Sequence, residues 1–266
     1  MMQPTFDPID EEFFGNYASF GIPKFDGIMK GGIPRGFMVI GITDPGAGAE
    51  LFAKQFCSPA EEPENTIYVT TNETLESVKE VYAKFGWDDS IQIDAIGHEY
   101  NQRVLERELQ ASRYRLEGFK MPDVQRLAQT RFVEEESEDF LTELTNKIMG
   151  LGQYFRCAID NLDFFFQRNE PGKVISMLRM IQAHTQTNRG ILLLTVSSDV
   201  VSKSIEMEMS MIADMLLNFG VHMIGTDFET RMVVRKFRNA PENLSVISYR
   251  VTPEEGITPE TVQRIA

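Results

Sequence analysis

The sequence predicts an α/β protein in which a mainly parallel central sheet is flanked by helices and ends in antiparallel edge strands. Three observations support this class. Short apolar runs alternate with segments of helical periodicity, a glycine-containing turn at residues 41–48 joins a strand to a helix, and the last two strand-like runs have no helix between them. Because parallel neighbours need a crossover connection, usually a helix, the alternation predicts parallel strands.

The first half of the chain predicts two units of a strand followed by a helix. Residues 37–40 are a short apolar run between glycines, which is typical of a buried strand, and residues 49–56 follow as a helix. Residues 66–70 predict a second strand, and residues 75–85 predict an amphipathic helix. The apolar side chains of that helix recur at the i, i+3, i+4, i+7 spacing of one helix face, namely Val78, Val81, Tyr82 and Phe85.

The second half repeats the alternation and then changes to an antiparallel ending. The acidic run at residues 134–139 precedes a helix that begins near Phe140, where the helix dipole favours negative charge. The last two strands are separated by a short Asn/Pro/Glu segment, which predicts a hairpin at a sheet edge. After the helix at 140, the expected elements are strand 154–159 ending at Asp160, helix 173–184, strand 191–196, strand 213–219, and the hairpin strands 232–238 and 244–251.

Composition predicts a folded protein with one α/β domain spanning residues 1–266. Hydrophobic residues make up 42% and charged residues 25% of the chain, which excludes disordered and fibrous classes. The net charge of −14 argues against a nucleic acid as a partner. Two cysteines and isolated histidines predict neither a disulfide framework nor a metal site. No leader or membrane-spanning run is evident, so we expect a cytoplasmic protein.

One stretch stands apart from this pattern. Residues 99–131 are polar and rich in arginine, and they contain no clean strand. We interpret this stretch as a mobile insertion or a partner surface.

Several ordered motifs carry a resemblance to a known family. The segment Gly31-Gly32-Ile33-Pro34-Arg35-Gly36 resembles the approach to the nucleotide loop of KaiC-type proteins of the RecA superfamily, and the similarity continues, in the same order as in that family, over about residues 15–250. The resemblance is to archaeal members and implies a P-loop NTPase fold. The further matching motifs are Gly46-Ala47-Gly48, Phe85-Gly86-Trp87-Asp88, the Walker B-like Ala158-Ile159-Asp160-Asn161-Leu162, the sensor-like Thr195-Val196-Ser197-Ser198, and Ala213-Asp214.

The phosphate loop departs from the family pattern. A P-loop reads Gly-x-x-x-x-Gly-Lys-Ser/Thr because backbone N–H groups cradle phosphate, the lysine offsets its charge and the hydroxyl holds Mg²⁺. Here Ala49 stands at the lysine position and Glu50 at the hydroxyl position, so we expect nucleotide binding to be weak or absent. The degenerate loop comprises Thr43, Asp44, Gly46, Gly48, Ala49 and Glu50.

The resemblance implies that the remaining catalytic positions are vestigial. The family's general base is the first of two adjacent acids, which are Asn72 and Glu73 here, and an amide cannot accept that proton. Asp160 remains at the Mg²⁺-positioning site, although it equally suits the end of a buried strand. Lys54 is the one lysine of the following helix, and its spacing from Ala49 predicts that it faces away from the loop.

A Lys-x-Arg pair near the end of the chain resembles a family element that reaches a neighbouring subunit's nucleotide. Lys236 and Arg238 lie one residue apart on the predicted strand and therefore on one face. We interpret the pair either as this trans-acting element or as a solvated edge-strand face.

Three functions follow from these observations. The favoured one is an inactive ATPase of the KaiC type that regulates or scaffolds a signal-transduction process through protein contacts, with an active KaiC-like paralogue or further copies of itself as partners. It needs no metal and no cofactor; ATP with Mg²⁺ enters only if the loop alignment or its consequence is wrong. The alternatives are an ATP-binding signal-transduction ATPase with an unusual loop and a recombinase-like DNA accessory protein, against which the acidic charge weighs.

Overall fold

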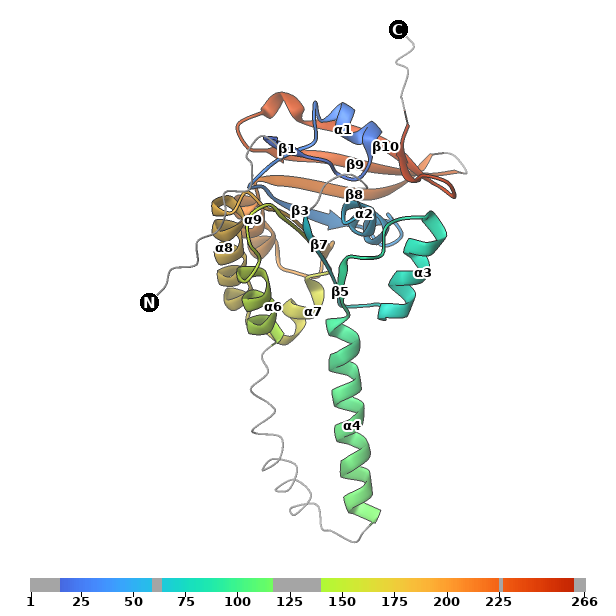
Figure 1. The fold of residues 1–266 in the computed structure, drawn as a ribbon, viewed down its shortest axis with the longest axis vertical. Coiled ribbons are helices and arrows are strands. Elements are labelled where there is room, and N and C mark those ends of the chain that lie inside the picture. The colour runs from blue at the N-terminus through green and yellow to red at the C-terminus, as the bar shows by residue number, and fades with distance from the viewer. Residues whose placement is uncertain (1–14, 59–63, 117–139, 225–226, 261–266) are drawn as a thin grey trace.

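The centre of the protein is a nine-stranded sheet (Figure 1). The computed structural model describes residues 15–58, 64–116, 140–224 and 227–260. In sheet order the strands are β11 (Gly256–Pro259), β10 (Ser245–Thr252), β9 (Asp227–Phe237), β8 (Met215–Ile224), β3 (Met38–Thr43), β7 (Ile191–Ser197), β6 (Phe155–Asp160), β4 (Asn65–Thr70) and β5 (Gln92–Asp94). A separate small sheet pairs β1 (Tyr17–Ala18) with β2 (Ile33–Pro34).

The sheet is parallel from β8 to β5 and antiparallel from β8 to β11. This arrangement confirms the predicted fold class. Strands β3, β6 and β7 read as continuous apolar runs because both faces of the parallel part are covered. Because these strands are parallel, their carboxyl ends lie at one edge of the sheet. The loops and polar residues that follow the strands are therefore brought together there.

Helices cover both faces of the sheet. One core contains side chains of α1 (Pro23–Ile28), α2 (Ala49–Phe56) and α3 (Leu75–Phe85). The other core contains side chains of the four helices α6 (Phe140–Met149), α7 (Asp163–Arg168), α8 (Pro171–Thr187) and α9 (Lys203–Ile212). Among the described residues, no helix combines the length and the apolarity that a membrane crossing requires.

Local signals explain why the predicted boundaries of two helices agree with the structure, whereas α8 extends beyond the predicted 173–184 at both ends. The Thr74 side chain accepts a hydrogen bond from the Ser77 amide at the start of α3, and Gly86 ends that helix in the left-handed conformation at φ 67°. The predicted bounds of α2 and α3 match the structure. The C-terminal strands are longer than predicted, because β8 and β9 pair over ten residue pairs and β11 adds a further edge strand.

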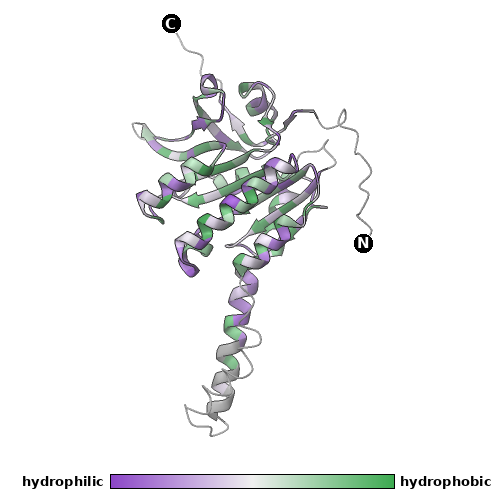
Figure 2. Cartoon of the chain, turned by 90° about the vertical axis from the view of Figure 1, so that its left-hand side faces the viewer, coloured by the Kyte–Doolittle hydropathy of each residue, from purple (hydrophilic) through white to green (hydrophobic). Residues whose placement is uncertain are grey.

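A long helix, α4 (Ile96–Leu116), projects from the body of the protein (Figures 1 and 2). It contains the first part of the stretch predicted as an insertion, residues 99–131; residues 117–139 lie outside the described part of the chain. Its first turns pack on the body, where the Arg103 guanidinium lies 4.9 Å from the centre of the Phe140 ring. Leu105 and Leu109, farther along, are more than half exposed.

Candidate functional site

The glycine-containing loop lies between the central strand β3 and α2, as the sequence predicts. Gly46 and Gly48 have φ angles of 81° and 76°, a backbone region that favours glycine, and Gly48 caps the start of α2. The Asp44 amide donates to the Phe219 carbonyl of β8 at 2.9 Å, which ties the loop to the neighbouring strand. The strand, loop and helix therefore follow one another as in a phosphate-binding loop, with left-handed glycines in the turn.

The side chains at the start of α2 do not match that geometry. Ala49 is 2% exposed and packs in the apolar core, whereas Glu50 is exposed. Asp44 is also exposed, so two carboxylates belong to the loop and the first turn of α2. At the other side of the loop, the Tyr249 hydroxyl donates to the Ala47 carbonyl, and burial raises the Tyr249 pKa. The charged side chains of this loop and of the first turn of α2 are therefore both carboxylates.

Asp160 lies at the carboxyl end of β6, which β7 separates from the loop's strand β3, and is 6% exposed. Both carboxylate oxygens accept hydrogen bonds: Oδ1 accepts from the Thr195 hydroxyl at 2.9 Å, and Oδ2 accepts from the Tyr68 hydroxyl at 3.0 Å. Burial raises the pKa of Asp160, while nearby Lys54 and the two hydroxyl donors lower it. The sequence placed Asp160 at a strand end, and the structure confirms that position.

Lys54 does not face away from the site, so the prediction for this residue is wrong. Its side chain is 2% exposed and its ammonium group forms an ion pair with Glu73, which follows β4. The ammonium also lies 5.4 Å from the centre of the Tyr68 ring. The helical spacing misled because α2 is enclosed on several sides: it contacts β6, β7 and β11, so it has no fully solvated face.

Glu73 is thus engaged on both oxygens. Oε1 pairs with Lys54, and Oε2 accepts a hydrogen bond from the Ser77 hydroxyl at 3.2 Å. The backbone amides of Asn72 and Glu73 both point to the Thr70 hydroxyl, at 3.3 and 3.2 Å. The structure therefore brings Glu73, Asp160 and Lys54 together, and the described residues contain no group of three or more potential metal ligands.

The Lys-x-Arg pair is engaged within the chain itself. The Lys236 ammonium donates to the carbonyls of Ser210 at 2.9 Å, Met211 at 3.0 Å and Ala213, at the C-terminal end of α9, where the helix dipole favours a cation. Arg238 forms an ion pair with buried Asp214 at 2.7 Å. These contacts account for both residues without a neighbouring subunit, and the trans-acting role stays a prediction.

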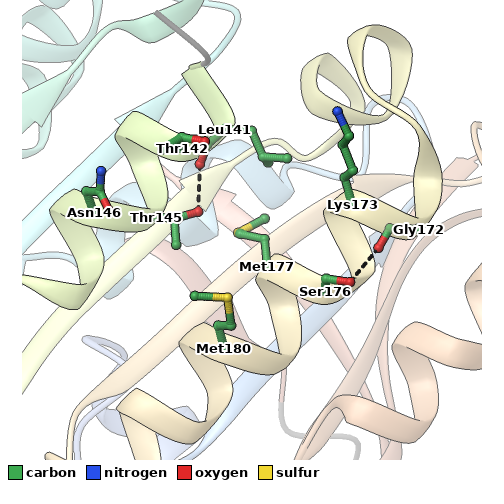
Figure 3. Close-up of a pocket in the computed structure, with 9 residues that line it drawn as sticks. All are labelled: Leu141, Thr142, Thr145, Asn146, Gly172, Lys173, Ser176, Met177 and Met180. Atoms are coloured by element: carbon green, nitrogen blue, oxygen red, sulfur yellow. Dashed lines mark hydrogen bonds between the residues drawn. The ribbon is translucent and has the colours of Figure 1, made fainter.

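A groove elsewhere on the surface is lined by none of the residues of the loop between β3 and α2. It lies between α6 and α8, and its volume is about 480 Å³ (Figure 3). The lining combines apolar and small polar side chains: Leu141, Thr142, Thr145, Asn146, Gly172, Lys173, Ser176, Met177 and Met180. Thr145 and Ser176 donate their hydroxyl hydrogens to carbonyls of their own helices, at 2.6 and 2.8 Å.

Comparison with known proteins places this geometry in a family. The family model described as "ATPase: KaiC" matches residues 18–261. A UPF0273 protein of Pyrococcus furiosus is 39% identical over 69 residues, and one of Methanopyrus kandleri is 37% identical over 72 residues. These alignments cover 26% and 27% of this chain; the chain spans only 28% and 29% of the relatives' lengths.

Two solved structures share the fold. A KaiC-like protein of Pyrococcus horikoshii has a TM-score of 0.61 at 20% identity, covering 92% of this chain and 98% of that one. The flagellar accessory protein FlaH of Methanocaldococcus jannaschii has a TM-score of 0.65 at 15% identity, covering 89% of this chain and 95% of that one.

The fold and the loop after β3 define a P-loop ATPase of the RecA superfamily. Within that class, the chain belongs to the KaiC ATPase family. The resemblance drawn from the ordered motifs is thereby confirmed.

Proposed function

We propose that this protein is a non-catalytic member of the KaiC ATPase family that acts as a regulatory or scaffolding subunit through protein contacts. One observation carries the proposal: the first turn of α2 offers a phosphate group the methyl of Ala49 and the carboxylate of Glu50. A P-loop offers an ammonium group and a hydroxyl at these positions.

The energetic cost of these replacements is large. A hydrogen bond to a charged group is worth about 1.5–3 kcal/mol, so losing the lysine contact weakens binding by about one to two powers of ten. The carboxylates of Glu50 and Asp44 add repulsion toward phosphate. The residues therefore do not fit Mg·ATP as the family implies, since Glu73 is also paired with the Lys54 ammonium.

The alternative function is ATP binding through an unusual loop. It is favoured by one observation, the retained left-handed conformations of Gly46 and Gly48, which keep the backbone of a phosphate cradle. In that case the backbone amides and the α2 dipole would supply the affinity without a lysine. A direct binding measurement separates the two functions.

Calorimetric titration with ADP and Mg·ATP is expected to show no binding to the wild-type protein up to millimolar nucleotide. The double variant Ala49→Lys/Glu50→Thr restores the ammonium and the hydroxyl, so we expect at least a tenfold gain in affinity. Glu208→Lys on α9 is the matched control, because it adds the same two units of positive charge away from the loop. Micromolar binding by the wild type would contradict the proposal and favour the alternative.

As a partner we propose an active KaiC-like paralogue. Adding the purified protein to such a paralogue at equimolar ratio is expected to change the paralogue's steady-state ATPase rate at least twofold. The reason is that family membership gives the two chains related folds, while this chain contributes no turnover of its own. An unchanged rate at saturating ratios would exclude this partner and leave other protein partners to be sought by cross-linking.

A further inference from the structure

A lysine buried beside the candidate nucleotide site calls for an explanation. Lys54 is 2% exposed, and removing an ammonium group from water is costly unless opposite charge compensates it. It comes from α2, the helix that follows the loop, and its side chain lies on the sheet side of that helix. Its backbone carbonyl accepts a hydrogen bond from buried Tyr82 at 2.9 Å, which fixes this turn of α2 in place.

The surroundings of the ammonium group supply that compensation from two strands. Glu73, beyond the end of β4, forms the ion pair, and Asp160, at the end of β6, is the second carboxylate whose charge the lysine attracts. Tyr68 contacts both Lys54 and Asp160. The Lys54 ammonium lies 5.4 Å from the centre of the Tyr68 ring, and the Tyr68 hydroxyl donates to Asp160 at 3.0 Å. One buried ammonium group therefore compensates the charge of two carboxylates at the edge of the sheet where the parallel strands end.

We propose that Lys54 is a specificity-determining residue: a built-in counter-ion for Glu73 and Asp160 that excludes a divalent cation, and with it a metal–nucleotide complex, from this site. The proposal rests on the proposed function. With Asp160 ionised, the two carboxylates and the ammonium together carry a net charge of −1, and the carboxylates alone carry −2; Glu50 adds negative charge in both cases. A divalent cation would then find two negative groups and no competing positive one.

The hydrogen bonds of the site support this assignment. Asp160 has both oxygens engaged by hydroxyl groups, and Glu73 has one engaged by Lys54 and one by Ser77. The hydroxyl donors are neutral and can redirect their hydrogens, whereas the Lys54 ammonium is a buried positive charge. Lys54 is thus the group that must be removed before a metal ion can take its place.

The test is a set of variants measured by thermal unfolding and by electron paramagnetic resonance titration with Mn²⁺. Lys54→Met is expected to lower the unfolding midpoint by at least 5 °C and to bind Mn²⁺ at least tenfold more tightly than the wild type. The double variant Lys54→Met/Glu73→Gln should recover more than half of the decrease in unfolding midpoint and should show no gain in Mn²⁺ affinity. The matched control is Lys147→Met, because Lys147 pairs with Asp94 at 2.5 Å away from the loop; it should gain no Mn²⁺ affinity.

Each outcome decides the proposal. No Mn²⁺ gain in Lys54→Met, or no recovery in Lys54→Met/Glu73→Gln, would overturn it. If Lys54→Met is unfolded at 25 °C, a folded double variant supports the charge coupling and an unfolded one overturns it. Failure of the proposed function looks different: the wild type itself would bind Mg·ADP at micromolar concentration, whatever the variants do.

Discussion

Replacing Glu64 by glutamine is expected to lower the free energy of unfolding by about 3–5 kcal/mol, the cost of breaking a buried ion pair from one side. Glu64 immediately precedes β4 and forms ion pairs with Arg35, at 2.6 Å, and with Arg156 of β6. The side chains of all three are at most 2% exposed. Without the carboxylate, two guanidinium groups would remain buried with an uncharged amide between them.

The position of this cluster makes the effect global. The Arg156 guanidinium also donates to the carbonyls of Ser19 and Phe56, each at 2.8 Å, and lies 4.8 Å from the centre of the Phe56 ring. It therefore joins the N-terminal segment, the end of α2 and the central sheet. Urea denaturation followed by circular dichroism measures the loss.

The matched control is Glu255→Gln, which removes the carboxylate of an exposed pair with Lys24 at 3.2 Å. Exposed pairs contribute about 0–1 kcal/mol, so this variant should unfold close to the wild type. Equal denaturation curves for Glu64→Gln and Glu255→Gln would contradict the assigned role of the buried cluster.

Gly97→Ala is expected to destabilise the protein by about 2–3 kcal/mol, at the upper end of overpacking effects. Gly97 lies in the first turn of α4, and a Cβ atom there would lie 1.7 Å from the Thr71 carbonyl oxygen. Because the clash is with backbone, no side-chain rotation relieves it. The base of α4 or the chain after β4 must move.

A second glycine in the same helical position provides the control. Gly172 is the second residue of α8, as Gly97 is of α4, and a Cβ atom at Gly172 meets nothing within 4 Å. Gly172→Ala should therefore leave stability unchanged or raise it by about 0.5–1 kcal/mol. Thermal unfolding of both variants distinguishes the two cases, and a loss in Gly172→Ala as large as in Gly97→Ala would contradict the steric argument.

The sequence was sufficient to predict the fold where local signals and burial agree. Residues 49–56 and 75–85 are helices with the predicted bounds, because a glycine turn and a Thr74 cap mark where they begin. Most of the parallel strands were readable because they are continuous apolar runs, but the three-residue edge strand β5 (Gln92–Asp94) was missed. Short elements such as α1 and β11 were missed, since their structure depends on tertiary contacts: the β11 amide of Ile257 donates to the Gln55 side chain of α2 at 2.8 Å.

The same dependence on tertiary contacts explains the error at Lys54. Helical periodicity assumes one buried face, but α2 buries both Lys54 and its neighbour Gln55, which also bonds the Glu255 carbonyl at 3.0 Å. Sequence patterns identified the chemistry lost from the loop, at Ala49 and Glu50. They did not show that the Lys54 ammonium is enclosed behind the loop. Its partner Glu73 is distant in sequence, and the two side chains meet only when β4 and α2 pack together.

The projecting helix α4 has the geometry of a lever arm. With 21 residues it is about 32 Å long, so a rotation of about 10° at its base displaces its far end by about 5–6 Å. That base touches Thr71 through Gly97, and the Thr71 amide donates to the Asp160 carbonyl at 2.8 Å. An adjustment of the backbone next to the candidate site that tilted this base would therefore displace the far end of α4 by a larger distance.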